Sequence, residues 1–331
     1  MKWYLLVIGA LLLTFIVLSF TTTPNINEGL AFAVSNANGT VFGTNEDRQT
    51  GEPIIYFRRA TSSTYGSVMF GYQESGEQYY ESGLNEAGLA WDFVPMPGAA
   101  VTPHSAREYR FTEDDVFLLM MQTTATVDEA LDLLEQVDFG LYINGQIVLA
   151  DALGNTVVVS PDETGEMVYS TSSEDYLVAA NFNPALEDGE GMWRYDETVE
   201  LLQNAPTNDL IGYGLDVLRD ISLNNDLRFT LYSASIDLET KQIQLAYKRQ
   251  YDDAITFTLD EYLAQYNQQF LMKDLFEDDV VAAGTANFNA FDQANQRVQI
   301  ISIIVGMALN ASVIALLIKW MRDDKKQQPQ I

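Results

Sequence analysis

Two long apolar segments lie near the ends of the 331-residue chain and limit the folded domain to the residues between them. Residues 3–20 are almost continuously apolar, and residues 300–318 are apolar apart from Ser302, Asn310 and Ser312. A helix of about 20 apolar residues is long enough to cross a bilayer. The sequence therefore predicts two transmembrane helices, residues 1–20 and 300–321. For the first, an uncleaved signal anchor and a cleaved signal peptide both remain open, although Ser19-Phe20-Thr21 is a poor cleavage site.

The basic residues beside these segments predict the topology. Lys2 precedes the first segment, and four basic residues follow the second: Lys319, Arg322, Lys325 and Lys326. Basic residues that flank a membrane span mark its cytoplasmic side. We therefore expect a cytoplasmic tail at residues 322–331 and an extracytoplasmic domain in between. If the first segment is not cleaved, both termini are cytoplasmic and the lipid bilayer is a partner through two helices.

Charge and residue usage exclude several function classes. The chain has 47 acidic and 18 basic residues, for a formal net charge of −29. Nucleic acid is therefore not an expected partner, because binding it requires a basic surface. There is no cysteine, and His104 is the only histidine. This rules out disulfides, thiolate chemistry and histidine-based metal clusters, so neither a metal nor a cofactor is expected.

The order of the expected elements predicts an α+β domain at residues 27–265. Strands with turn residues between them are followed by two helical segments near residues 112–137, and strands then return. Sheets should stack with helices on their outer faces. Residues 266–299 are acidic and then rich in Ala, Asn and Gln, and they are interpreted as a juxtamembrane tether. Asn38-Gly39-Thr40 is a glycosylation sequon whose use depends on the host.

The stretch from Gly29 to Asp47 reads as a strand, a turn and a second strand. Apolar and small residues alternate over residues 30–35, Asn36-Ala37-Asn38-Gly39 supplies the turn, and an extended segment resumes at Thr40. Asn45-Glu46-Asp47 then places polar groups at the end of the hairpin, where a packed sheet normally has apolar or turn residues.

Several segments together resemble the linear-amide C–N hydrolases, the choloylglycine hydrolase and penicillin V acylase group of the N-terminal-nucleophile hydrolases. Residues 43–47 (GTNED) are similar to the family's GxNxD segment, and residues 82–90 (SGLNEAGLA) to its GMNEKGL turn. Residues 149–159 and 179–184 resemble its DxTGxxxVxE and LTNxP segments, and Trp193-Arg194-Tyr195 and Thr230–Ser233 fall where relatives carry RY and YS. The resemblance covers residues 29–260 and implies a four-layer αββα sandwich.

The resemblance also implies site residues and a chemistry. In this family an N-terminal cysteine attacks an amide carbonyl, its own α-amine acts as the base, an aspartate holds the nucleophile, and asparagines stabilise the oxyanion. Asp47, Asn85 and Asn181 match the aspartate and the asparagines, while Thr44 replaces an arginine that is common in relatives. The nucleophile position is occupied by Gly29 or Asn27, depending on the alignment.

Three hypotheses follow. The first is a membrane-anchored, catalytically inactive relative that binds a small amide or acyl ligand, or a protein. The second is an active hydrolase of linear amide bonds that uses a processed threonine among Thr21, Thr22 and Thr23, or another non-cysteine nucleophile. The third is a structural surface module that dimerises through residues 300–318.

Overall fold

The computed structural model describes residues 28–111, 115–183, 188–189, 192–225, 228–264 and 267–326. The folded domain forms one compact unit that ends at Phe288, and a second unit contains the residues from Asn289 onward. The two units are described separately.

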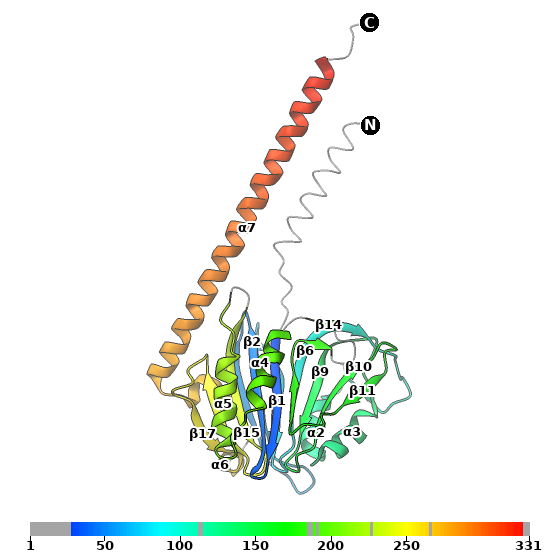
Figure 1. Ribbon diagram of the computed structural model, residues 1–331, viewed down its shortest axis with the longest axis vertical. Helices are drawn as coiled ribbons and strands as arrows, with labels where there is room; N and C mark the ends of the chain where they lie inside the picture. The colour runs from blue at the N-terminus through cyan, green and yellow to red at the C-terminus, as the bar shows by residue number, and fades with distance from the viewer. Residues whose placement is uncertain are drawn as a thin grey trace. The chain divides into compact units, whose positions relative to one another are not determined.

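The first of the domain's two large sheets has six antiparallel strands, and the strand pair predicted from Gly29 to Asp47 lies near its centre (Figure 1). In spatial order the strands are β12 (Tyr176–Ala179), β1 (Glu28–Asn36), β2 (Gly39–Arg48), β15 (Phe229–Asp237), β16 (Gln242–Tyr247) and β17 (Ile255–Thr258).

The second sheet has eight strands and packs face to face with the first. In spatial order they are β11 (Met167–Ser170), β10 (Thr156–Pro161), β9 (Tyr142–Ala150), β6 (Ala90–Ala100), β5 (Glu77–Asn85), β4 (Ser67–Glu74), β3 (Glu52–Arg58) and β18 (Gln268–Leu271). Two small pairs complete the described strands: β13 (Phe182–Asn183) with β14 (Asp188–Gly189), and β7 (Tyr109–Arg110) with β8 (Val137–Asp138). The predicted α+β class with two sheets is confirmed.

Helices cover the outer faces of both sheets. α4 (Met192–Leu202) and α5 (Leu210–Asp220) pack on the six-stranded sheet, and α2 (Val116–Thr123) and α3 (Val127–Leu134) pack on the eight-stranded sheet. Asp115 and Thr126 cap α2 and α3, since their side chains accept the backbone N–H groups of Leu118 and Glu129. α6 (Leu259–Leu263) and a 3₁₀ turn (Met272–Leu275) follow β17 and β18 respectively.

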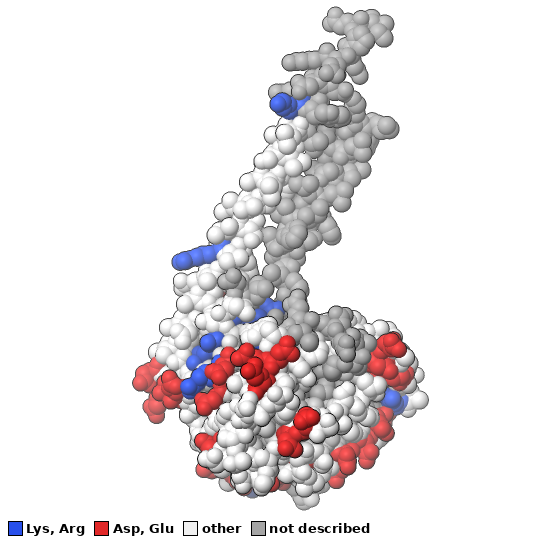
Figure 2. Space-filling model, in the orientation of Figure 1, with Lys and Arg blue, Asp and Glu red and all other residues white. Residues whose placement is uncertain are grey.

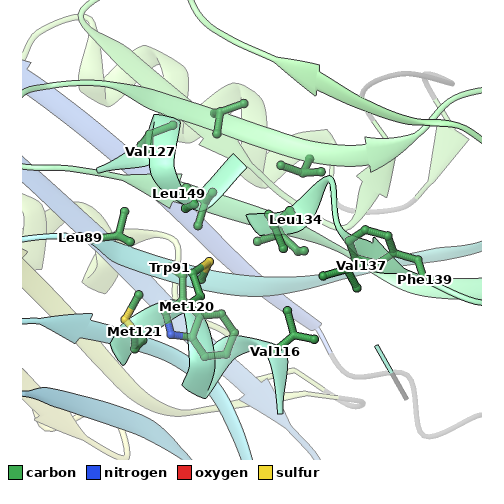
Figure 3. Packing of buried hydrophobic residues seen from close by; sticks show 14 of the residues in the cluster. Leu89, Trp91, Val116, Met120, Met121, Val127, Leu134, Val137, Phe139 and Leu149 are labelled. Carbon is green, nitrogen blue, oxygen red and sulfur yellow. The ribbon is translucent and has the colours of Figure 1, made fainter. Parts of the chain in front are cut away.

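The core under α2 and α3 is closely packed and apolar (Figure 3). Trp91 on β6 is fully buried and stacks on Phe117 of α2 with ring centroids 3.9 Å apart. Met120 and Met121 are both buried there. Burying a side chain of this size contributes about 1.5–3 kcal/mol, so this face of the eight-stranded sheet is held by the hydrophobic effect.

The segment after the sheets differs from the expected tether. β18 pairs with β3 at the edge of the eight-stranded sheet, and α7 (Asp278–Lys326) begins soon afterwards. The folded unit therefore extends to Phe288, past the predicted boundary at residue 265. Aromatic contacts hold this segment on the domain. Phe270 of β18 packs edge-on against Phe57 and Tyr262, and further along the chain Phe276 contacts Tyr247.

Among the described residues, α7 is the single helix long and apolar enough to cross a membrane. It contains the predicted span at residues 300–321, and apolar side chains such as Ile301, Met307 and Leu316 are exposed along it. In Figure 2 the visible surface of α7 is mostly uncharged, whereas acidic side chains are spread over the domain. The other predicted transmembrane helix, residues 1–20, lies outside the described residues.

Candidate functional site

The β1–β2 hairpin carries the residues that the family resemblance assigns to a catalytic site. Its register closes with Asn36 opposite Gly39, and Gly39 adopts a φ of +126°, which favours glycine. From Thr40 onward every residue of β2 is buried, including the polar run from Thr44 to Arg48. A strand that buries five consecutive polar residues must supply each of them with partners.

Side chains alternate between the two faces of a strand, so this polar run is divided between two environments. Asn45 and Asp47 point to the helices: Asp47 reaches α4, and Asn45 reaches α5. Thr44 and Arg48 point to the eight-stranded sheet, where they contact β6 and β5. We refer to these as the helix face and the inner face of β2.

On the helix face, Asp47 forms a fully buried ion pair. Its Oδ2 lies 2.7 Å from Nη1 of Arg194, and the two side chains are 0% and 1% exposed. The Thr230 hydroxyl donates a hydrogen bond to Asp47 Oδ1. Arg194 Nε donates to the backbone oxygen of Ile221 at 3.1 Å, while Arg194 Nη2 has no hydrogen-bond partner among the described residues.

Asn45 belongs to the same arrangement because it too reaches the end of α5. Its amide nitrogen donates to the Leu218 carbonyl oxygen at 2.9 Å, and the Tyr251 hydroxyl donates to the same oxygen at 3.3 Å. The Ser233 hydroxyl donates to the Asn45 side-chain oxygen. The last carbonyl groups of a helix lack partners within the helix and carry partial negative charge. Asn45 and Arg194 supply these partners and fasten α5 to β2.

Asn181 lies just beyond β12, near Gly29. Its amide nitrogen donates to the Pro95 carbonyl oxygen at 2.8 Å, and its side-chain oxygen has no partner among the described residues. β12 pairs with β1 so that Ala179 lies opposite Ala31, which brings Asn181 level with Gly29. A Cβ atom on Gly29 would lie 3.5 Å from Pro95 Cδ. The structure thus brings the positions of Gly29 and Asn181 together around Pro95.

Asn85 occupies a different setting. Its amide nitrogen donates to the carbonyl oxygens of Met121 and Thr124, at 3.1 and 2.7 Å, and its oxygen accepts the backbone N–H groups of Ala87 and Leu89. The side chain therefore fixes the turn between β5 and β6 to the end of α2. No described hydrogen bond or ion pair joins Asn85 to Asp47 or Asn181, so the predicted trio is not assembled as one group. Asn27, the alternative nucleophile position, lies outside the described residues.

The inner face holds a group that the sequence did not predict, formed by Glu46, Arg48, Glu81 and Asp92, which we call the inner cluster. Arg48 Nη1 lies 3.1 Å from Glu81 Oε1, and the Thr44 hydroxyl donates to Asp92 Oδ2. The four side chains sit between the two sheets and are nearly inaccessible, with residue exposures of 1–8%. The Arg48 guanidinium also stacks over the Tyr72 ring at 3.2 Å.

Burial dominates the electrostatics of the inner cluster. It raises the pKa of Glu46 and of Asp92 well above their ordinary values, because a charged carboxylate loses its hydration there. The neighbouring carboxyls raise the pKa of Glu46 further, and the Thr44 hydrogen bond partly opposes the shift of Asp92. Burial also raises the pKa of Glu81, with the Arg48 charge opposing it.

Sequence reasoning noted Arg194 within a family segment but gave it no role, and it did not single out Glu46 or Asp92. The sequence does contain some indication of Glu46 and Asp92. Glu46 belongs to a polar run inside a strand, and Asp92 interrupts the apolar segment Ala90–Val94. What the sequence did not show is which faces meet, because this depends on the packing of the two sheets.

The described residues contain no group of three or more acidic residues or histidines arranged to hold a metal ion. His104, the lone histidine, lies on the surface, where its Nε2 is 2.9 Å from Glu166 Oε2. It makes no described contact with Asp47 or with the inner cluster.

No protein-family model matches the sequence, and no curated protein matches it either. Its fold, however, matches solved structures. An arginine-to-leucine variant of the conjugated bile acid hydrolase from Clostridium perfringens superposes with a TM-score of 0.55 at 13% identity, over 73% of this chain and 95% of that one. Penicillin V acylase from Agrobacterium tumefaciens gives 0.49 at 15% identity over 66% and 82% of the chains. A cysteine-to-alanine mutant of the Clostridium enzyme gives 0.48 at 12% identity over 73% and 96%.

The first of these matches shows that the domain shares the fold of such hydrolases. The predicted fold similarity to N-terminal-nucleophile hydrolases is therefore confirmed. At 13% identity the likeness extends to the fold alone, and it leaves the chemistry of this chain to be argued from its own residues.

Proposed function

We propose that the chain is a membrane-anchored relative of amide hydrolases that has lost N-terminal-nucleophile catalysis and serves as an extracytoplasmic binding module. The proposal rests on the residue at the family's nucleophile position, Gly29, and on its place within a paired strand. This residue has no side chain to act as a nucleophile, it lies inside β1 opposite Glu46, and the preceding Glu28 is also paired, opposite Asp47. The sequence contains no cysteine that could replace it.

The contacts of Asp47 support the same proposal. The family role of this aspartate is to hold the nucleophile, whereas here both of its carboxylate oxygens are engaged, by Arg194 and by Thr230. These partners tie β2 to α4 and, through Ile221, to α5. A carboxylate engaged in this way has a sufficient structural role without catalysis.

An activity assay tests the loss of catalysis. Full-length protein in mild detergent would be incubated with N-acyl amino acids, a conjugated bile acid and penicillin V, and product would be measured by mass spectrometry. We expect no turnover above buffer, and no difference between the wild type and Asn181→Ala. Turnover that Asn181→Ala abolishes would overturn the proposal. Binding of the same compounds without turnover, measured by calorimetry, is the result expected of a retained ligand site.

Intact-mass analysis separates this proposal from the active alternative. Catalysis by a processed threonine requires a mature chain that begins at Thr21, Thr22 or Thr23, because the free α-amine acts as the base. We expect the purified chain to begin elsewhere. A mass that corresponds to one of those three termini, together with turnover, would favour the active hydrolase.

The membrane topology has a direct test because the chain lacks cysteine. We expect a membrane-impermeant maleimide, applied to intact cells, to label Glu163→Cys in the domain and not Gln327→Cys in the tail. Wild-type protein is the unlabelled control, and permeabilised cells show that both positions can react. Labelling of Gln327→Cys in intact cells would contradict an extracytoplasmic domain with a cytoplasmic tail.

A further inference from the structure

The inner cluster has more carboxyl groups than cations. It contains three carboxyls (Glu46, Glu81 and Asp92) and one guanidinium, that of Arg48, which is bonded to Glu81 at 3.1 Å. Neither Glu46 nor Asp92 has an ion pair with a described residue. An ionised carboxylate buried without a cation is so costly that such a group normally takes up a proton.

Two buried hydroxyl groups are available as hydrogen-bond acceptors for protonated carboxyl groups. Tyr232 lies opposite Glu46 across β15 and β2, and Ser82 lies opposite Asp92 across β5 and β6. Both residues are 1% exposed. Neither hydroxyl has a hydrogen bond of normal geometry to a described residue, although the two lie close to each other. A hydroxyl oxygen can accept from a protonated carboxyl, so each carboxyl has a buried acceptor on its own face of the sheet.

Local irregularities of the strands create this arrangement. A bulge between Phe70 and Gly71 leaves Glu81 as the extra residue of β5, next to Ser82. A second bulge between Thr230 and Tyr232 lets Thr230 reach Asp47 on the helix face while Tyr232 pairs with Glu46 on the inner face. Bulges commonly re-aim side chains in this way.

We propose that Glu46 and Asp92 are protonated carboxylic acids in the folded domain at neutral pH, and that their loss of protons at higher pH loosens the contact between the two sheets. The groups around them are few. Glu46 lies near Arg48 on its own strand, Glu81 on β5, Asp92 on β6 and Tyr232 on β15, and the charge of Asp47 acts on it from the helix face. Asp92 accepts a hydrogen bond from Thr44 and lies near Glu46, Glu81 and Tyr232, and the charge of Asp47 acts on it from the helix face.

The sign of the pH dependence follows from the direction of the shifts. The pKa of each carboxyl is raised in the folded state, chiefly by burial, above the unfolded values of about 3.9 for Asp and 4.3 for Glu. The folded state therefore holds protons that the unfolded state has released. Stability from these groups is fully present below the unfolded pKa and is lost as the pH rises through the folded pKa. A carboxylate stabilised as an ion would show the opposite dependence.

Denaturation of the full-length protein in mild detergent, at pH values from 5 to 9, tests the proposal. We expect the guanidinium chloride midpoint, followed by near-ultraviolet circular dichroism, to fall as the pH rises. The double variant Glu46→Gln, Asp92→Asn should show a smaller fall, because its amides have no proton to lose. Glu174→Gln, a change at an exposed carboxyl, is the matched control and should keep the wild-type slope. An unchanged slope in the double variant would overturn the proposal.

Infrared spectroscopy of the wild type gives a second test that does not depend on the folding of a variant. We expect the carbonyl stretch of protonated carboxyl groups to be present at pH 7 and to diminish towards higher pH. If the wild type lacks this band at pH 7, Glu46 and Asp92 are ionised and the proposal is wrong. The inference concerns the proton content of the inner cluster alone, and it stands whether or not the domain catalyses a reaction.

Discussion

The two faces of β2 bury similar side chains but balance their charge differently. On the helix face one carboxylate, Asp47, meets one guanidinium, Arg194, at 2.7 Å. On the inner face three carboxyls lie near one guanidinium, that of Arg48, which is paired with Glu81. Both regions are nearly inaccessible, so they differ mainly in the number of cations near their carboxyl groups. The helix face has one cation for its one carboxyl group, whereas the inner face has too few, and this shortage is our reason for proposing that Glu46 and Asp92 are protonated.

The largest expected effect is the loss of Arg194. The variant Arg194→Met should lower the free energy of unfolding by about 3–5 kcal/mol, because it leaves the Asp47 carboxylate buried without its cation. Urea denaturation of the full-length protein in detergent measures this change. The double variant Arg194→Met, Asp47→Leu should recover much of the loss, since it removes both charges.

A surface pair provides the control for that measurement. Arg219 lies 3.0 Å from Asp252, but the two side chains are 41% and 91% exposed. Exposed ion pairs contribute about 0–1 kcal/mol, so Arg219→Met should have a small effect. Equal losses in Arg194→Met and Arg219→Met would show that the helix face is not held by its buried ion pair.

The sequence predicted the strands around β2 better than the side-chain contacts that β2 makes. The alternation and turn residues from Gly29 to Asp47 predicted the hairpin, and the motif order predicted the fold. The 11-residue helix α5 was missed, although Asp209 caps it and apolar residues recur along it at helical spacing. That omission matters because α5 supplies the carbonyl groups that Asn45 and Arg194 bind.

The family motifs also assigned the same role to two asparagines whose surroundings in the folded domain differ. Asn85 and Asn181 both match family asparagines, yet Asn85 uses its whole amide group on the turn and α2. Asn181, beside Gly29, has a side-chain oxygen without a hydrogen-bond partner in the described part of the chain. Neither the two bulges nor the pairing of the sheets is visible in a single sequence. For this reason the sequence did not predict that the residues of the inner cluster lie together.

Two glycines of the hairpin allow a smaller test of the same comparison. Gly43 lies on the helix face, where an added Cβ would come within 2.3 Å of the buried Phe32 ring. On the inner face, a Cβ at Gly29 would lie 3.3 Å from the Asn45 carbonyl oxygen. Gly43→Ala should therefore cost about 1–3 kcal/mol through overpacking. For Gly29→Ala we expect less than about 1 kcal/mol, because the lower entropy of the unfolded chain offsets part of the tight contact.

Thermal unfolding of the two alanine variants measures this difference. The expected order implies that the position assigned to the nucleophile can still accept a side-chain carbon, so that packing does not require glycine there. This result would agree with the proposal that catalysis has been lost while the fold is retained. If Gly29→Ala proves as costly as Gly43→Ala, the space beside Pro95 does not accept a side-chain carbon, and packing requires glycine at this position.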